Sequence, residues 1–192
     1  MNNAIIIEKY SPEWASAFQK LKFVFEQKIG NLLAEIQHVG STAVEGLASK
    51  PVLDIDLVIE SREVLPELIQ ALGKLGYEYV GDLGIEGREA FLQRSEKSPE
   101  DGKGSSWPVH HLYACTKDNN AFQNHIKFRD YLRQNPVKAN EYGELKKQLA
   151  AENKSDRLLY SEKKTDFIID ALRKIGGDEK NLEQIISQNK IK

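Results

Sequence analysis

Residues 52–59 are the feature of this 192-residue chain that most constrains its fold. Apolar side chains alternate there with Asp54 and Asp56, and a period of two is typical of a β-strand whose two faces meet different surroundings. The face predicted to point into the core carries four aliphatic residues, Leu53, Ile55, Leu57 and Ile59. Because side chains alternate across a strand, both aspartates must lie together on the opposite face.

A Gly-Ser pair precedes this strand, with twelve residues between Ser41 and Asp54. Gly40 allows the backbone to turn tightly and to approach a phosphate closely, and Ser41 adds a hydroxyl group and exposed amides. Asp54 and Asp56 can share a hard cation such as Mg²⁺ or Mn²⁺ through oxygen ligands, as phosphoryl and nucleotidyl transfer require. These residues together predict a phosphate and metal pocket.

The rest of the N-terminal part alternates between strand and helix patterns. Isoleucines predict an opening strand over residues 4–8, and Ser11 followed by Pro12 predicts a helix that runs to about Gly30. A helix is also expected over residues 65–76, with further strands at residues 36–39, 77–80, 90–93 and 109–115. The polar segment 95–107 is expected to be a mobile loop outside the core.

The chain from Asn119 onward shows only helical patterns. Pro136 marks the start of a helix, and Gly176 and Gly177 interrupt the pattern. Residues after Gly177 are expected to form a weakly docked helix or a frayed end.

Charge and cysteine content narrow the classes of function. The 27 basic and 29 acidic residues give a net charge of −2, so no overall basic footprint indicates nucleic acid as a partner, and any anion site must be local. Cys115 is the single cysteine, which excludes internal disulfides, and it is expected to pack in the core. No apolar run near the N-terminus has the length of a signal peptide or membrane span, so we expect a cytoplasmic protein without a membrane partner.

The Gly-Ser turn followed by paired acids resembles the signature of the nucleotidyltransferase superfamily, and more closely the GrpB family. The stretches that carry the GrpB likeness are residues 10–14, 37–47, 50–55, 110–115, 128–133 and 160–168. The likeness implies an α+β fold with a nucleotidyltransferase-like mixed β-sheet, flanking helices and a C-terminal helical part. We expect a core over residues 1–134 and a helical extension packed on it over residues 135–192.

The sequence departs from the wider superfamily pattern at the third metal-binding acid, which a later strand usually carries. Here that strand contains His110 and His111, which are adjacent and so point to opposite faces. We predict that His111 faces the aspartates, although imidazole is a poorer ligand for Mg²⁺ than for Zn²⁺ or Mn²⁺. Glu45 stands where relatives often carry proline and adds a negative charge near the predicted anion pocket.

Cationic side chains are needed to neutralise a triphosphate, and Lys50 and Arg129 are the first candidates because both lie in stretches that carry the GrpB likeness. Further candidates are Arg88, Arg133 and Lys164. A solvated surface position is the alternative for each of them. His38 and His125 are interpreted as structural or surface groups. Three aromatic residues at helical spacing are assigned to the core, Phe122, Phe128 and Tyr131.

Three hypotheses of function follow. The first is an enzyme that uses Mg²⁺ or Mn²⁺ to transfer a nucleoside monophosphate from a nucleoside triphosphate to an unknown acceptor, with Asp54, Asp56 and His111 as catalytic residues. The second is a binding module for a nucleotide or phosphometabolite, and the third is an interaction protein, including a homo-oligomer, on the same fold. The plain alternatives for the motif are a simple turn at Gly40 and Ser41 and a solvent-facing strand end at the acids.

Overall fold

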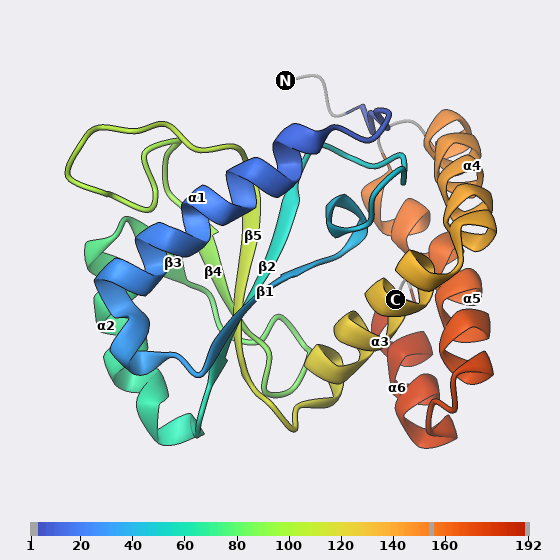
Figure 1. Ribbon diagram of the computed structural model, residues 1–192. Coiled ribbons are helices and arrows are strands. Elements are labelled where there is room, and N and C mark those ends of the chain that lie inside the picture. Colours follow the sequence, from blue (N-terminus) through green and yellow to red (C-terminus); the bar gives the residue numbers. More distant parts are fainter. Residues whose placement is uncertain (1–3, 154–155, 191–192) are drawn as a thin grey trace.

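The computed structural model describes residues 4–153 and 156–190, which form a mixed β-sheet with helices around it (Figure 1). The strand order is β1-β2-β5-β4-β3, where β2 and β5 are parallel and the other neighbours are antiparallel. The strands are β1 Glu35–Val39, β2 Leu53–Ile59, β3 Tyr77–Tyr79, β4 Glu89–Gln93 and β5 His110–Thr116. The predicted α+β class with a mixed sheet is therefore confirmed.

Six α-helices are described, together with short 3-10 turns at Gly30–Leu32, Ser41–Ala43 and Arg62–Val64. The α-helices are α1 Pro12–Ile29, α2 Leu65–Lys74, α3 Asn120–Gln134, α4 Pro136–Asn153, α5 Arg157–Lys174 and α6 Glu179–Asn189. Ser11 caps α1 as predicted, because its side chain accepts a hydrogen bond from the Glu13 amide at 3.2 Å. None of these helices is long and apolar enough to cross a bilayer.

The main hydrophobic core lies on one face of the sheet, where α1 and α2 pack. The alternating aliphatic residues of β2 point into it, as the sequence predicts, and meet buried side chains such as Phe18 and Phe25 of α1 and Leu68 of α2. The other face of β2 carries Asp54 and Asp56 and turns toward the C-terminal helices, which gather on the far side of the molecule from α2 (Figure 1). The position of the acids thus follows from the strand period.

The predicted opening strand over residues 4–8 is wrong. Only Glu8 makes a bridge, to Ser49, and the rest of the segment pairs with no strand. Ile5 is buried instead against Leu149 and Tyr160 of the C-terminal helices. Of the isoleucines that suggested a strand, Ile5 and Ile7 therefore serve helix packing, whereas Ile6 is exposed.

The loop over residues 95–107 is irregular as predicted, but it is not wholly outside the core. Ser98 is buried and its hydroxyl donates to the Gly76 carbonyl at 2.7 Å, while the Glu100 amide donates to the Leu75 carbonyl at 2.9 Å. These bonds fasten the middle of the loop to the end of α2. Its mobility stays a prediction.

The C-terminal helices pack on one another and on the segment that follows the Gly-Ser turn. Val44 and Leu47 from that segment share a cluster with Leu132 of α3 and Tyr142 of α4. The helix after Gly177 is docked more firmly than expected, because Leu182 of α6 is buried against α5. The division of the chain after residue 134 stays a prediction.

Candidate functional site

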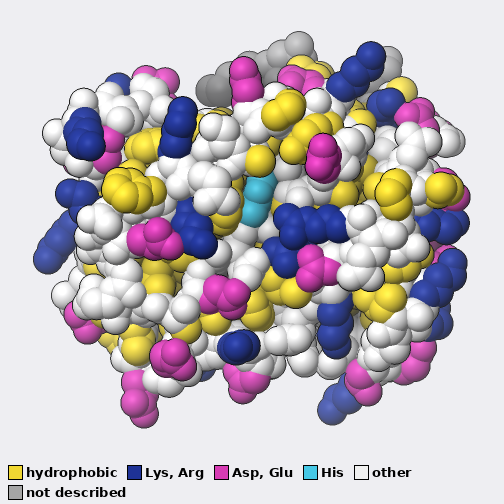
Figure 2. Space-filling view, viewed as in Figure 1, with side chains coloured by type: hydrophobic (Ala, Val, Ile, Leu, Met, Phe, Trp, Pro, Cys, Tyr) yellow, Lys and Arg dark blue, Asp and Glu magenta, His cyan; other side chains and the backbone are white. Residues whose placement is uncertain are grey.

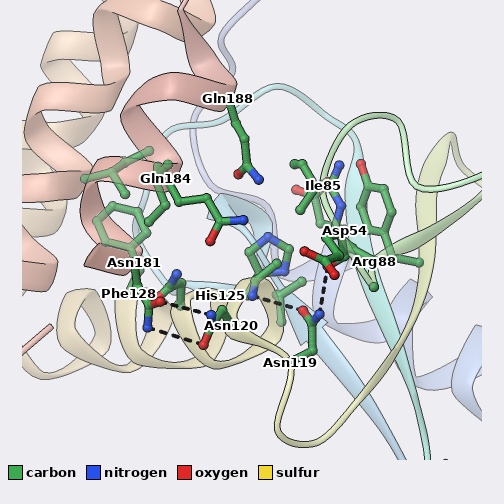
Figure 3. A pocket seen from close by; sticks show the side chains of 18 of the residues that line it. Asp54, Ile85, Arg88, Asn119, Asn120, His125, Phe128, Asn181, Gln184 and Gln188 are labelled. Carbon is green, nitrogen blue, oxygen red and sulfur yellow. Dashed lines mark hydrogen bonds between the residues drawn. The ribbon is translucent and has the colours of Figure 1, made fainter. Parts of the chain in front are cut away.

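A cavity of about 890 Å³ lies between the polar face of β2 and the C-terminal helices (Figure 3). Its walls come from the Gly-Ser turn, from the loop over residues 82–88, and from α3, α5 and α6. A volume of this size suits a ligand as large as a nucleotide. Gly40, Ser41 and Asp54 all line it, so the predicted turn and the first predicted acid belong to one site.

The turn and the first acid are packed against each other. Gly40 has a φ of +68°, in the left-handed region that favours glycine, and a Cβ atom there would lie 2.9 Å from Cγ of Asp54 and closer still to its Oδ2. Residue 40 must therefore be glycine for Asp54 to keep this position. The arrangement places a carboxylate directly beside backbone that is suited to holding a phosphate.

Each aspartate forms a pair with a histidine. His111 Nδ1 lies 2.8 Å from Asp54 Oδ1, and His125 Nδ1 lies 2.7 Å from Asp56 Oδ2. The parallel register explains the first pair, since residue 54 of β2 stands opposite residue 111 of β5. The second pair brings in α3, which crosses the polar face of the sheet. His111 thus lies beside the acids as predicted, while its role stays a prediction.

The two acids differ in burial. Asp54 reaches the cavity, whereas Asp56 is 1% exposed and its Oδ1 has no hydrogen-bond partner among the described residues. The expectation that both carboxylates open into one cleft is therefore met by Asp54 alone. The difference follows from depth, because Asp56 lies one strand period farther along β2, where His125 of α3 packs on it.

The pairing with histidine also sets the charge of these groups. Burial alone would raise the pKa of Asp54, but the hydrogen bond and the positive charge of His111 hold that pKa below its ordinary value. Burial would lower the pKa of His125, but the charge of Asp56 and its hydrogen bond raise it. Asp54 therefore favours its carboxylate form, and His125 favours its protonated form.

The four carboxylate oxygens of Asp54 and Asp56 decide whether this site suits a divalent cation. The histidines engage Asp54 Oδ1 and Asp56 Oδ2, which leaves Asp54 Oδ2 beside the turn and the unpartnered Asp56 Oδ1. A buried carboxylate oxygen without a partner is costly, and a cation would satisfy it. No group of three potential ligands among His, Cys, Asp and Glu occurs in the described part of the chain. The described residues therefore offer one carboxylate at the cavity and a second, buried carboxylate oxygen on the same strand face, without a third acid.

The cationic candidates are placed differently from the predicted ranking. Arg88 and Lys164 line the cavity. The Arg88 guanidinium lies 4.3 Å from the Tyr113 ring centre, and its buried Nε has no hydrogen-bond partner in the described structure. An unpartnered guanidinium nitrogen at a cavity wall is suited to an anionic ligand.

Arg129 and Arg133, by contrast, bind the protein itself. Arg129 Nη1 donates to the Gln37 side chain at 2.6 Å and to the His38 carbonyl at 2.9 Å, and Arg133 donates to the Ala43 carbonyl. Both arginines therefore fasten the backbone on either side of the Gly-Ser turn. Neither lines the cavity, and a ligand contact from Arg129 stays a prediction.

Lys50 is half-buried and also stands outside the cavity lining, with its Nζ 5.0 Å from the centre of the Tyr160 ring. Its contact with a ligand stays a prediction. His38 is structural as interpreted, because it stacks on Phe18 and bonds to Thr42 at 3.0 Å. Cys115 is buried as expected, and Glu45 is exposed and does not line the cavity.

Sequence reasoning missed two parts of this site. His125, interpreted as structural or surface, lines the cavity and pairs with Asp56, and Phe128, assigned to the core, also lines it (Figure 3). The second missed part is a wall of side-chain amides, Asn119, Asn120, Asn124, Asn181, Gln184, Gln188 and Asn189. A signal was present, because Asn181, Gln184 and Gln188 recur at helical spacing on α6.

Comparisons with known proteins identify the family. The GrpB protein family model matches residues 4–174. The UPF0157 protein YqkA of Bacillus subtilis is 33% identical over 159 residues, which are 83% of this chain and 43% of YqkA. The glutamate-rich protein GrpB of Alkalihalophilus pseudofirmus is 31% identical over 172 residues, which are 89% of this chain and 95% of that protein.

One solved structure agrees with this assignment. The crystal structure of the conserved protein GrpB from Enterococcus faecalis is similar at a TM-score of 0.72 and 32% identity, over 88% of this chain and 99% of that one. A structure of the Cid1 poly(U) polymerase is similar at a TM-score of 0.49 and 18% identity, over 76% of this chain and 44% of that one, which is too weak a likeness to transfer its chemistry. The chain belongs to the GrpB family.

Proposed function

We propose that the cavity binds a nucleoside triphosphate together with Mg²⁺ or Mn²⁺, and that the chain transfers the nucleoside monophosphate to an acceptor. One observation carries the proposal. The Asp54 carboxylate is packed against the Gly40 turn at the cavity wall, and the unpartnered Oδ1 of Asp56 is buried on the same strand face. Carboxylate oxygens beside a phosphate-binding turn are what a nucleotide and its cation require together.

The other walls supply the remaining parts of such a ligand site. The Ser41 hydroxyl and nearby amides are suited to one phosphate, and Arg88 offers a guanidinium to another. The wall of amides defined above offers neutral donors and acceptors to a base and a sugar. A cation held by Asp54 and Asp56 would neutralise phosphate charge and stabilise the charge that develops during transfer.

The histidines give the acceptor a route for its proton. His111 and His125 each direct Nδ1 at a carboxylate, so Nε2 is the ring nitrogen left to take a proton from an acceptor hydroxyl. His125 lines the cavity and is the better placed of the two. The aspartates orient the rings, and the charge of Asp56 raises the pKa of His125 against the effect of burial, which favours the imidazolium form of that ring.

A second candidate is a binding module that holds the nucleotide or another phosphometabolite without transfer. The observation in its favour is the missing third carboxylate in the part of the chain that the structure describes. Where that acid would be expected on β5, His111 and Tyr113 stand opposite Asp54 and Asp56. The two candidate functions bind the same ligand, and only the first transfers part of it to an acceptor.

A thermal-shift panel of nucleoside triphosphates, each with and without Mg²⁺ or Mn²⁺, tests the shared claim. Binding to the folded state raises the melting temperature by mass action, and we expect the rise only with the cation present. Release of pyrophosphate from the stabilising nucleotide with candidate acceptors then separates transfer from mere binding. If no triphosphate stabilises the protein with either cation, the proposal is wrong.

A further inference from the structure

Three lysines from distant parts of the sequence lie at the α4 and α5 side of the cavity. Lys50 precedes β2, Lys146 belongs to α4 and Lys164 to α5. Lys50 Nζ and Lys164 Nζ lie 5.0 Å and 4.8 Å from the centre of the Tyr160 ring. Figure 2 shows that Lys and Arg side chains are interspersed with Asp and Glu over one face of the molecule, so no single basic surface dominates that face.

Lys146 is the most unusual member of this group. Its side chain is 2% exposed, and Nζ has no hydrogen-bond partner among the residues that the structure describes. Its Nζ lies 4.8 Å from the centre of the Tyr142 ring, and Tyr142 itself lines the cavity. A buried ammonium group without a counter-ion is costly, so a lysine in this position indicates a missing partner.

The three lysines have little direct neutralisation from acidic side chains in the described part of the chain. None of them forms an ion pair within the described residues, and Asp54 is the acid whose charge reaches all three. Burial and then the neighbouring charge of Lys164 lower the pKa of Lys146 to about 6, against the opposing effect of Asp54. Burial and then Lys50 lower the pKa of Lys164 to about 8. Burial and then Arg157 lower the pKa of Lys50.

We propose that Lys50, Lys146 and Lys164 form an anion subsite that receives the terminal phosphates of a polyphosphate ligand. Lys164 stands at the cavity wall, Lys50 shares the Tyr160 ring with it, and Lys146 packs on Tyr142, which also lines the cavity. A polyphosphate supplies the negative charge that the cluster lacks, and its approach restores the proton that burial removes from Lys146. The inference rests on the proposed function, since it assigns the phosphate end of the same cavity.

The alternative is that these lysines only pack on tyrosine rings and support the helices. The two readings predict opposite behaviour for Lys146→Met, which keeps the length of the side chain and removes its amine. A packing lysine would leave ligand binding unchanged when replaced. If Lys146 binds the ligand, its replacement should weaken anion binding. The stability of the unliganded protein should then stay the same or increase in Lys146→Met.

Calorimetry with inorganic triphosphate as the probe, at pH 7.5 in two buffers of different ionisation enthalpy, tests the subsite. We expect the wild type to bind with uptake of protons, and Lys146→Met to weaken binding about tenfold or more and to reduce the proton uptake. Lys147→Met is the matched control, because Lys147 is the next residue on α4 and pairs with Glu144 on the surface. It is expected to bind as the wild type does.

Equal affinity and equal proton uptake in the wild type and Lys146→Met would overturn the inference. If Lys146→Met does not fold, Lys164→Met carries the same test, since it removes the amine that lines the cavity. Failure of the lysine subsite can be distinguished from failure of the proposed function. Stabilisation of both wild type and Lys146→Met by a nucleoside triphosphate with Mg²⁺, to the same extent, would retain the proposed function and reject the subsite alone.

Discussion

The two faces of β2 have opposite chemical character. One face presents Leu53, Ile55 and Leu57, all buried beneath α1 and α2. The other presents Asp54 and Asp56, each paired with a histidine beside the cavity. A single seven-residue strand therefore supplies both the centre of the core and the proposed chemistry.

Neighbouring residues of β2 therefore contribute to different properties, one to the stability of the fold and the next to the proposed function. The apolar face gains free energy from burial, whereas the polar face holds a buried, unpartnered oxygen and unpaired cations that reduce stability unless a ligand satisfies them. Substitutions on the first face should affect folding and leave the ligand requirements intact. Substitutions on the second face should change ligand binding and affect folding less.

Leu57→Ala should have the largest effect on stability. Leu57 is completely buried, so its truncation removes apolar contacts and leaves a cavity that costs about 2 to 5 kcal/mol in the free energy of unfolding. Urea unfolding measures the loss. At temperatures where the variant stays folded, a nucleoside triphosphate with Mg²⁺ should still stabilise it, and the loss of that response would contradict the separation of the two faces.

Gly40→Ala tests the place where the polar face meets the turn. The new Cβ would collide with the Asp54 carboxylate and hold residue 40 at a positive φ, which costs about 1 to 3 kcal/mol. Nucleotide stabilisation should disappear as well, because Asp54 must move. Gly30→Ala is the control, since Gly30 has a helical φ of −58° and no atom within 4 Å of the added methyl group. Equal behaviour of the two variants would refute the assigned geometry.

The pH dependence of unfolding distinguishes the polar face further. Lys146 has a folded-state pKa of about 6, below its ordinary value of 10.5, so between these values the unfolded chain binds a proton that the folded chain does not. Its contribution should make stability rise with pH by up to about 1.4 kcal/mol per unit. Lys146→Met should flatten the rise between pH 7 and 8.5, and an unchanged slope would show that Lys146 stays charged.

Asn181→Ala should have the smallest effect on stability. Asn181 and Asn120 exchange side-chain hydrogen bonds at 2.9 and 3.3 Å and join α6 to α3 (Figure 3). Because the pair is partly exposed, its loss should cost less than about 1 kcal/mol in chemical unfolding. The ranking of nucleotides in the thermal-shift panel should change more, since the amide wall is altered. An unchanged ranking would show that the amide wall does not contribute to ligand recognition.

The sequence predicts the parts of the fold that depend on local periodicity. The alternation in residues 52–59 placed the acids opposite the core, and Ser11 with Pro12 placed the start of α1. The opening strand failed because pairing requires a neighbouring strand, which local pattern does not reveal. Ile5 packs on the C-terminal helices instead.

The site was predictable where a short motif places its residues or, for His111, where a predicted strand does so. Gly40, Ser41 and Asp54 follow from a short motif, whereas His125 reaches Asp56 across 69 positions and Lys146 reaches Lys164 through the packing of two helices. The ranking of the cationic candidates stays a prediction and meets the same limit. Arg129 and Arg133 lie in a motif-bearing stretch but bind the backbone around the turn, a contact that only the tertiary arrangement shows.

The most direct test of the account is the cation dependence of nucleotide binding in the wild type and Asp54→Asn. The amide keeps the size of the carboxylate and removes the charge that would hold the cation. Asp118→Asn is the control, because Asp118 also lines the cavity but belongs to neither Asp-His pair. Titration calorimetry with the triphosphate that stabilises most should show Mg²⁺-dependent binding in the wild type and the control, and weak binding without Mg²⁺ dependence in Asp54→Asn. Mg²⁺-dependent binding of undiminished affinity in Asp54→Asn would contradict the account.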